Sequence, residues 1–123
     1  MLSITIPVYF LVLCTAYSAS FDECGKTDGI TASGIKAVEG KTVAADDLPL
    51  GTQIEIDGTV YTVHDRFGAG HKGRIDIYKE QKSDCIKFGR QYKAARIVSI
   101  PEKETFEFVV PCATRIGYTN YYF

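Results

Sequence analysis

The sequence predicts a small all-β domain with one short helix. Its 123 residues suit a single domain. Short apolar runs alternate with polar residues at a period of two, and glycine and proline separate these runs. Only one stretch has a helical pattern with its own start and stop residues. These three observations favour a compact β-structure over a helical or mixed fold.

The first twenty residues predict a secretory signal peptide. They contain no Lys, Arg, Asp or Glu, and the apolar run 4–13 is too short to span a bilayer comfortably. Small residues follow this run, which predicts cleavage after Ser18 or Ser20. The alternative is a short membrane anchor that is never cleaved. We therefore expect a signal at 1–20, a domain at 21–123, a secreted or periplasmic location and no stable membrane insertion.

The β-strands are expected in six short stretches of the remaining chain. They cover residues 42–45, 52–57, 59–64, 74–78, 95–100 and 106–110. The pair Asp57-Gly58 between the second and third stretches is a strong hairpin signal. The helix is expected at 83–88, with Ser83 as its N-cap and Gly89 ending it in the left-handed region. The tyrosine-rich stretch 115–123 is either a final edge segment or a tail.

Charge and cysteine content limit the partners and the cross-links. The chain has 14 basic and 15 acidic residues and a net charge of -1, which gives no support for a nucleic-acid partner. Signal cleavage would leave Cys24, Cys85 and Cys112, so an exported domain could form one disulfide by any of three pairings. The cysteine spacings do not resemble a zinc site, and no cofactor is implied.

Asp76 is the most informative single residue for chemistry. It lies in the middle of a predicted strand between Ile75 and Ile77, although Asp is depleted in strand interiors. Its face of the strand is therefore either solvated or lines a site. The alternatives are an exposed edge residue or a partner for Arg74.

Asp65 ends the preceding predicted strand, and a glycine-rich loop joins it to the strand of Asp76. If the two strands are close, their carboxylates converge and the pKa of one is raised. A carboxyl that is protonated at neutral pH can act as a general acid. The alternative is that Asp65 has only a structural role as a turn residue, because Asp is common where strands end.

Two other sites fit this region less well. A metal site would draw on His64, Asp65, His71 and Asp76. Their spacing matches no familiar ligand set, so no metal is expected. The glycine-rich loop 68–73 begins no predicted helix and lacks the lysine followed by serine or threonine of a phosphate-binding loop.

The order of the motifs resembles the three-aspartate (3D) domain family. The motifs are Ile-Thr-Ala-Ser-Gly at 30–34, Val-Ala-Ala-Asp at 43–46, Leu-Pro-Leu-Gly-Thr at 48–52, an Asp-led loop from 65, and Arg-Ile-Asp-Ile-Tyr at 74–78. The resemblance runs from about residue 24 to residue 100. This family shares its barrel with MltA-type lytic transglycosylases and stationary-phase muralytic proteins. The resemblance implies a six-stranded double-psi β-barrel.

The family's three aspartates fall on Asp46, Asp65 and Asp76, the last two being eleven residues apart as is common in the family. The resemblance implies that Asp76 does the acid–base work, that Asp65 orients it, and that Asp46 fixes the substrate or stabilises positive charge on the sugar. The family often has Thr and then Gly after its second aspartate. In this sequence Arg66 and Phe67 occupy those two positions, which affects the expected shape of the glycan groove.

The resemblance also implies a function and a set of substrate contacts. Thr31, Ser33 and Lys72 match the motifs and are candidates for hydrogen bonds to glycan, although Thr31 and Ser33 could instead complete a turn. The expected activity is lytic cleavage of MurNAc–GlcNAc linkages in peptidoglycan, with a 1,6-anhydro product.

Two alternatives to the enzyme remain open. One is an expansin-like glycan binder without catalysis, which would use exposed aromatic residues such as Tyr61, Phe67 and Tyr78 to stack on sugars. The other is a structural or phage-lysis accessory protein that uses the barrel as a scaffold. Fold alone does not distinguish between these functions.

Overall fold

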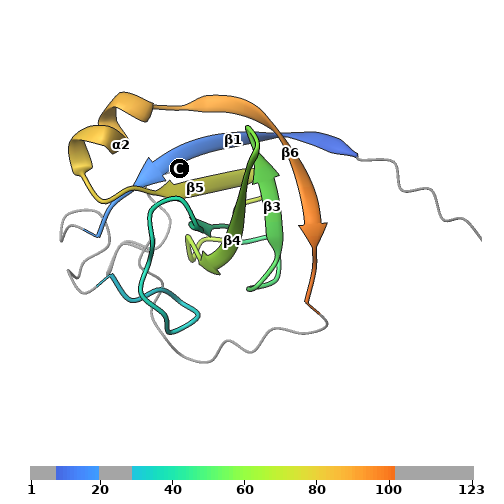
Figure 1. Ribbon diagram of the computed structural model, residues 1–123, viewed down its shortest axis with the longest axis horizontal. Helices are drawn as coiled ribbons and strands as arrows, with labels where there is room; N and C mark the ends of the chain where they lie inside the picture. The colour runs from blue at the N-terminus through green and yellow to red at the C-terminus, as the bar shows by residue number, and fades with distance from the viewer. Residues whose placement is uncertain (1–7, 20–28, 102–123) are drawn as a thin grey trace, which may run out of the picture.

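The computed structural model of the protein describes residues 8–19 and 29–101, which form a closed six-stranded β-barrel with one short helix (Figure 1). The elements are β1 (Tyr9–Tyr17), β2 (Thr42–Ala44), β3 (Gln53–Ile56), β4 (Thr59–Asp65), β5 (Arg74–Tyr78), α2 (Lys82–Phe88) and β6 (Gln91–Ser99). Around the barrel the order is β1-β5-β2-β4-β3-β6, and β6 pairs with β1 to close it. Because the barrel closes, each strand has a hydrogen-bonded neighbour on both sides.

Two of the six strand pairs are parallel, and the other four are antiparallel. The parallel pairs are β1 with β5 and β2 with β4. The antiparallel pairs are β2–β5, β3–β4, β3–β6 and β1–β6. The parallel pair β2–β4 carries Asp65, and the parallel pair β1–β5 carries Asp76.

The strand β1 lies inside the segment whose sequence predicts a signal peptide. It sits between β5 and β6, and it pairs with β6 over Tyr9–Cys14 and with β5 over Leu13–Tyr17 (Figure 1). Val12 and Cys14 on one face of β1 are 1% and 0% exposed in the barrel core. Cleavage after Ser18 or Ser20 stays a prediction, but removing residues 1–20 would take β1 away and leave β5 and β6 each with an open edge.

The barrel core is built from the alternating apolar residues that define the strands. Ile54 and Ile56 of β3 and Ile75 and Ile77 of β5 are each at most 4% exposed. They belong to one buried cluster with Val12, Cys14, Val43, Ala45, Leu50, Val63 and Ala95. Burying an isoleucine side chain contributes about 1.5–3 kcal/mol, so this alternation is the main driving force for closing the barrel.

The hairpin between β3 and β4 confirms the prediction for Asp57-Gly58. Ile56 and Thr59 are paired across the turn, and only Asp57 and Gly58 lie between them. Asp57 has φ 52° and Gly58 has φ 79°. Two positive φ values in a two-residue loop are the requirement of a type I′ turn, which Asp and Gly tolerate.

The helix α2 begins at Lys82, one residue earlier than expected. Gln81 is its N-cap and makes no side-chain capping bond, so the prediction that Ser83 caps the helix is wrong. Gly89 ends the helix as expected, but its φ of 65° and ψ of −136° lie outside the left-handed helical region. Cys85 is the buried residue of this helix.

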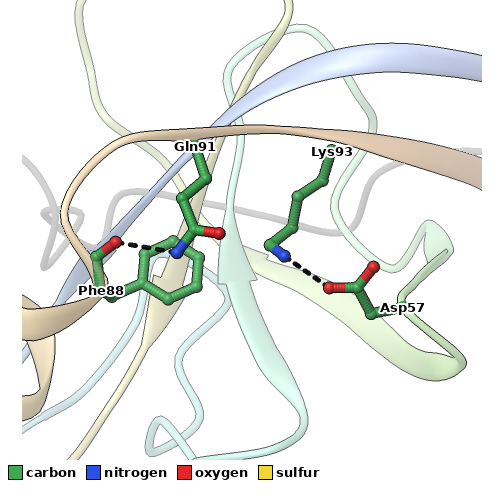
Figure 2. Close-up of polar contacts among 4 residues, drawn as sticks. All are labelled: Asp57, Phe88, Gln91 and Lys93. Carbon is green, nitrogen blue, oxygen red and sulfur yellow. Dashed lines mark hydrogen bonds and ion pairs between the residues drawn. The ribbon is translucent and has the colours of Figure 1, made fainter.

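Polar contacts attach the end of α2 to the barrel (Figure 2). The Gln91 side-chain amide donates to the Phe88 carbonyl at 2.9 Å, and Lys93 Nζ lies 2.6 Å from Asp57 Oδ2. The Lys93 ammonium also lies 6.0 Å from the centre of the Phe88 ring. These contacts link α2, β6 and the β3–β4 hairpin at one end of the barrel.

Several predictions lie outside the described residues, namely the strand at 106–110, the stretch 115–123, and the pairing options that involve Cys24 and Cys112. The strand predicted at 95–100 is found, but it is longer and begins at Gln91. Among residues 8–19 and 29–101, no helix is long and apolar enough to cross a membrane.

Candidate functional site

The register of four adjacent strands places Asp65 and Asp76 in one transverse row. Thr15 of β1 pairs with Asp76 of β5, Asp76 pairs with Ala44 of β2, and Ala44 pairs with Asp65 of β4. The two aspartates therefore flank Ala44 from opposite sides. With strands about 4.8 Å apart, their Cα atoms are separated by roughly 10 Å.

A β-bulge sets the position of Asp65 in this row. Val43 pairs with Val63, but the next residue of β2, Ala44, pairs with Asp65, so the register passes over His64. A bulge of this kind re-aims the side chain that follows it. In a regular ladder without the bulge, His64 would pair with Ala44 and the two carboxylates would not share a row.

The Asp65 carboxylate is fully buried and held by several donors. It is 0% exposed, and it accepts hydrogen bonds from the Ala32 N–H at 3.0 Å, the Arg66 N–H at 2.9 Å and the Tyr17 hydroxyl at 3.1 Å. Donors of this number favour an ionised carboxylate. Asp65 thereby fixes the loop that contains Ala32 against the end of β4.

Asp76 lies on the middle of β5 and keeps slight access to solvent. It is 8% exposed, and the Thr15 hydroxyl donates to its Oδ1 at 2.9 Å. Because β5 is flanked by β1 and β2, Asp76 is not an exposed edge residue. Of the two aspartates in the row, Asp76 is the more exposed, although it too is largely buried.

The two positions that the sequence predicts as glycan contacts in the 30–34 motif differ in access. Thr31 is 0% exposed, and its hydroxyl donates to the Ile35 carbonyl at 2.7 Å and lies 2.9 Å from the Ser33 hydroxyl. Ser33 is half-buried, and its N–H donates to the His64 carbonyl at 3.0 Å. Thr31 thus stabilises the turn, whereas Ser33 and the exposed Lys72 can be reached from solvent.

Asp46 is outside the row and binds the backbone of the glycine-rich loop. Its Oδ1 accepts from the N–H groups of Phe67 and Gly68 at 2.8 and 3.0 Å. Its Oδ2 accepts from those of Ala69 and His71 at 3.2 and 2.9 Å. Four backbone donors on one carboxylate make Asp46 the residue that shapes this loop.

Three further hydrogen bonds hold the two ends of the same loop. The Gly73 N–H donates to Asp47 Oδ2 at 2.8 Å. The Arg66 guanidinium donates to the carbonyls of Ala45 (2.8 Å) and Leu48. Arg66 therefore ties the loop to the connection between β2 and β3.

The aromatic residues considered for sugar stacking do not form an exposed row. Phe67 is 3% exposed, with Arg74 5.2 Å from its ring centre and the His71 ring 5.3 Å away, edge to face. Tyr78 is 7% exposed and Tyr61 is half-buried. These side chains pack the domain in this structure and present no continuous stacking surface.

The two histidines near the site are shifted towards their neutral forms. Burial lowers the pKa of His64, whose Nδ1 lies 3.0 Å from the Thr42 hydroxyl. Burial and then the charge of Arg74 lower the pKa of His71. Within the part of the chain that the structure describes, no three His, Cys, Asp or Glu side chains are grouped so as to hold a metal ion.

Two residues of this site, Thr15 and Tyr17, are absent from the sequence-based set of candidates. They lie in the segment that the sequence assigns to a signal peptide. The same apolar run is also compatible with a buried strand, and this was the available indication in the sequence. The sequence matches no family model and no curated protein.

Proposed function

We propose that this protein is a peptidoglycan lytic transglycosylase with Asp76 as its acid–base residue. The observation that carries the proposal is the row in which Asp76 and Asp65 flank Ala44, one slightly open to solvent and the other fully buried. Resemblance to the 3D family supplies the substrate class. The associated location is the cell envelope, secreted or periplasmic, where glycan strands are found.

The topology supports a double-psi barrel as the finer description of the fold. The strand order around the closed barrel is β1-β5-β2-β4-β3-β6. If β1, β2 and β3 are exchanged with β4, β5 and β6 respectively, the same pairs of strands remain neighbours. The parallel pair β1–β5 then becomes the parallel pair β4–β2. This internal two-fold relation is what we expect of two interlocked halves, because each parallel pair joins a strand of one half to a strand of the other.

The proposed reaction needs one proton donor that becomes a proton acceptor. Protonated Asp76 gives its proton to the glycosidic oxygen as the bond from C1 of MurNAc to that oxygen breaks. The 6-hydroxyl oxygen of the same MurNAc then bonds to C1, and its proton passes to the Asp76 carboxylate. The 1,6-anhydro ring is closed, Asp76 regains its proton, and no water or second nucleophilic carboxylate is required.

The other two aspartates have supporting roles in this proposal. Ionised Asp65, held by its three donors, disfavours a second negative charge nearby and so helps Asp76 to retain a proton. Asp46 keeps the loop 66–73 in place beside the row through four backbone donors. Ser33 and Lys72 are the accessible candidates for hydrogen bonds to the glycan.

The test is digestion of purified peptidoglycan by the full chain, by Asp76→Asn and by Asp84→Asn, with products identified by mass spectrometry. We expect anhydro-muropeptides from the wild type and at least a roughly hundredfold lower yield from Asp76→Asn, the scale of losing a general acid. Asp84, on the exposed face of α2, gives a matched control that makes the same charge change.

Two outcomes would contradict the proposal. Equal product yields from wild type and Asp76→Asn would remove Asp76 from the chemistry. No product from the wild type, with the protein still sedimenting with the wall, would favour the expansin-like binder instead.

A further inference from the structure

The strand β1 supplies a side chain to each aspartate of the row. The Thr15 hydroxyl donates to Asp76 Oδ1 at 2.9 Å, and the Tyr17 hydroxyl donates to Asp65 Oδ2 at 3.1 Å. Thr15 and Tyr17 are two residues apart, so they point to the same face of β1. One short segment therefore contacts both carboxylates that the proposed chemistry uses.

The packing around Tyr17 fixes the direction of its hydroxyl. Tyr17 is 4% exposed and its ring lies 5.5 Å from that of Tyr78, in an edge-to-face arrangement. Ala37 and Ala44 complete this second buried cluster. The phenol therefore reaches Asp65 from a ring that is held on several sides.

The same strand is also required to complete the barrel. On its other face, Val12 and Cys14 are buried in the main core. The backbone of β1 pairs with β5 from Leu13 to Tyr17 and with β6 from Tyr9 to Cys14. A chain that begins after Ser18 or Ser20 would lose both ladders, part of the core and both hydroxyl donors.

We propose that residues 9–17 are retained in the working protein as strand β1, and that Thr15 and Tyr17 are positioning residues for Asp76 and Asp65. The positioning role rests on the proposed function, whereas retention of the strand rests on the barrel alone. Tyr17 holds the ionised Asp65 in orientation, and Thr15 fixes which oxygen of Asp76 faces outward. Any export of the protein would then proceed without removal of this segment.

Three hydroxyl variants of the full chain test the positioning role without a substrate. Carbon NMR of the Asp65 and Asp76 carboxyl groups over a pH series reports the titration of each group. We expect Tyr17→Phe to move the Asp65 midpoint upward, because a lost donor disfavours the ionised form. We expect Thr15→Val to move the Asp76 midpoint in the same direction, and Thr15→Ser to restore it.

The control for Tyr17→Phe is Tyr92→Phe, which removes the same oxygen from a side chain that is 69% exposed. Neither carboxyl should respond to it. Folded Tyr17→Phe and Thr15→Val variants with unmoved carboxyl midpoints would overturn the positioning role. Because these titrations do not depend on wall digestion, they remain informative even if no anhydro product is found.

Retention of the strand is tested by comparing the full chain with a chain that starts at Phe21, together with the intact mass of protein recovered from producing cells. We expect a recovered mass that includes residues 9–17, and loss of the cooperative thermal transition in the shortened chain. A recovered protein that starts after Ser18 or Ser20, or a shortened chain that unfolds cooperatively at the temperature of the full chain, would overturn retention.

Discussion

The region around Asp65 and the region around Asp46 both surround a carboxylate with hydrogen-bond donors, but they do so with different parts of the chain. Asp65 stands at the end of a barrel strand, and its donors come from β1, the 30–34 motif and its own neighbour Arg66. Asp46 follows β2, and its four donors are successive or nearly successive backbone N–H groups of one loop.

The difference shows which carboxylate depends on the whole fold. Two donors of Asp65 come from positions 17 and 32 and reach it only in the folded barrel, whereas Arg66 is its neighbour in the chain. The donors of Asp46 are within positions 67–71, so its effect is confined to one loop. We therefore expect changes at Asp65 to act on global unfolding and changes at Asp46 to act on local opening.

The largest expected effect is that of Asp65→Ala on global stability. Three donors would lose their acceptor in a site that is 0% exposed, at roughly 1–3 kcal/mol each. We expect the free energy of unfolding to fall by about 3–5 kcal/mol, measured by urea denaturation. A loss below about 1 kcal/mol would show that Asp65 does not organise the barrel.

Asp46→Ala should have a smaller and more local effect. The loop it binds is partly exposed, so water can replace the carboxylate, and we expect a loss of about 1–3 kcal/mol. Hydrogen exchange should accelerate at the amides of Phe67, Gly68, Ala69 and His71 before it does so in β5. Asp47→Ala, which releases only the Gly73 N–H, is the matched control. Uniform acceleration of hydrogen exchange throughout the barrel would show that Asp46, like Asp65, acts on global unfolding.

The exposed carboxylate of Asp57 on the hairpin gives a reference for the stability effects expected at Asp65 and Asp46. Asp57 is 65% exposed in its ion pair with Lys93, so solvent screens the pair and we expect only about 0.2–1 kcal/mol from it (Figure 2). Asp57→Asn removes the charge while keeping a residue that tolerates φ 52°. Its stability difference from wild type should shrink in 1 M salt, about the concentration at which surface pairs are strongly screened. A salt-independent difference would indicate a role beyond the ion pair.

The smallest expected effect concerns pH and the half-buried His64 beside Asp65. Burial lowers its pKa in the folded protein below the ordinary value of 6.5. The unfolded chain therefore binds more protons below pH 6.5, and folding stability falls as the pH falls through that range. Replacing His64 by Gln should flatten this dependence in thermal melts from pH 7 to pH 5. An unchanged slope would assign the dependence to other groups such as His71, whose pKa is also lowered.

Local sequence signals predicted much of the barrel wall. The alternating isoleucines of 74–78 correspond to β5 from end to end, and Asp57-Gly58 forms the expected turn. These features are set by side-chain period and by backbone preferences of two adjacent residues, which act within a few positions of the chain. The helix α2 ends at Gly89, as expected from the backbone freedom of glycine. Ser83 does not cap it, since the helix starts at Lys82 and Gln81 is at the N-cap.

Tertiary structure decided the identity of β1 and the composition of the site. An apolar run such as 4–13 is compatible with a signal peptide or with a buried strand, and only its pairing with β5 and β6 distinguishes the two. The bulge at Ala44 brings Asp65 rather than His64 into the row with Asp76. Residue types and periods are local properties of the sequence, whereas which carboxylates face each other depends on strand register across the closed barrel.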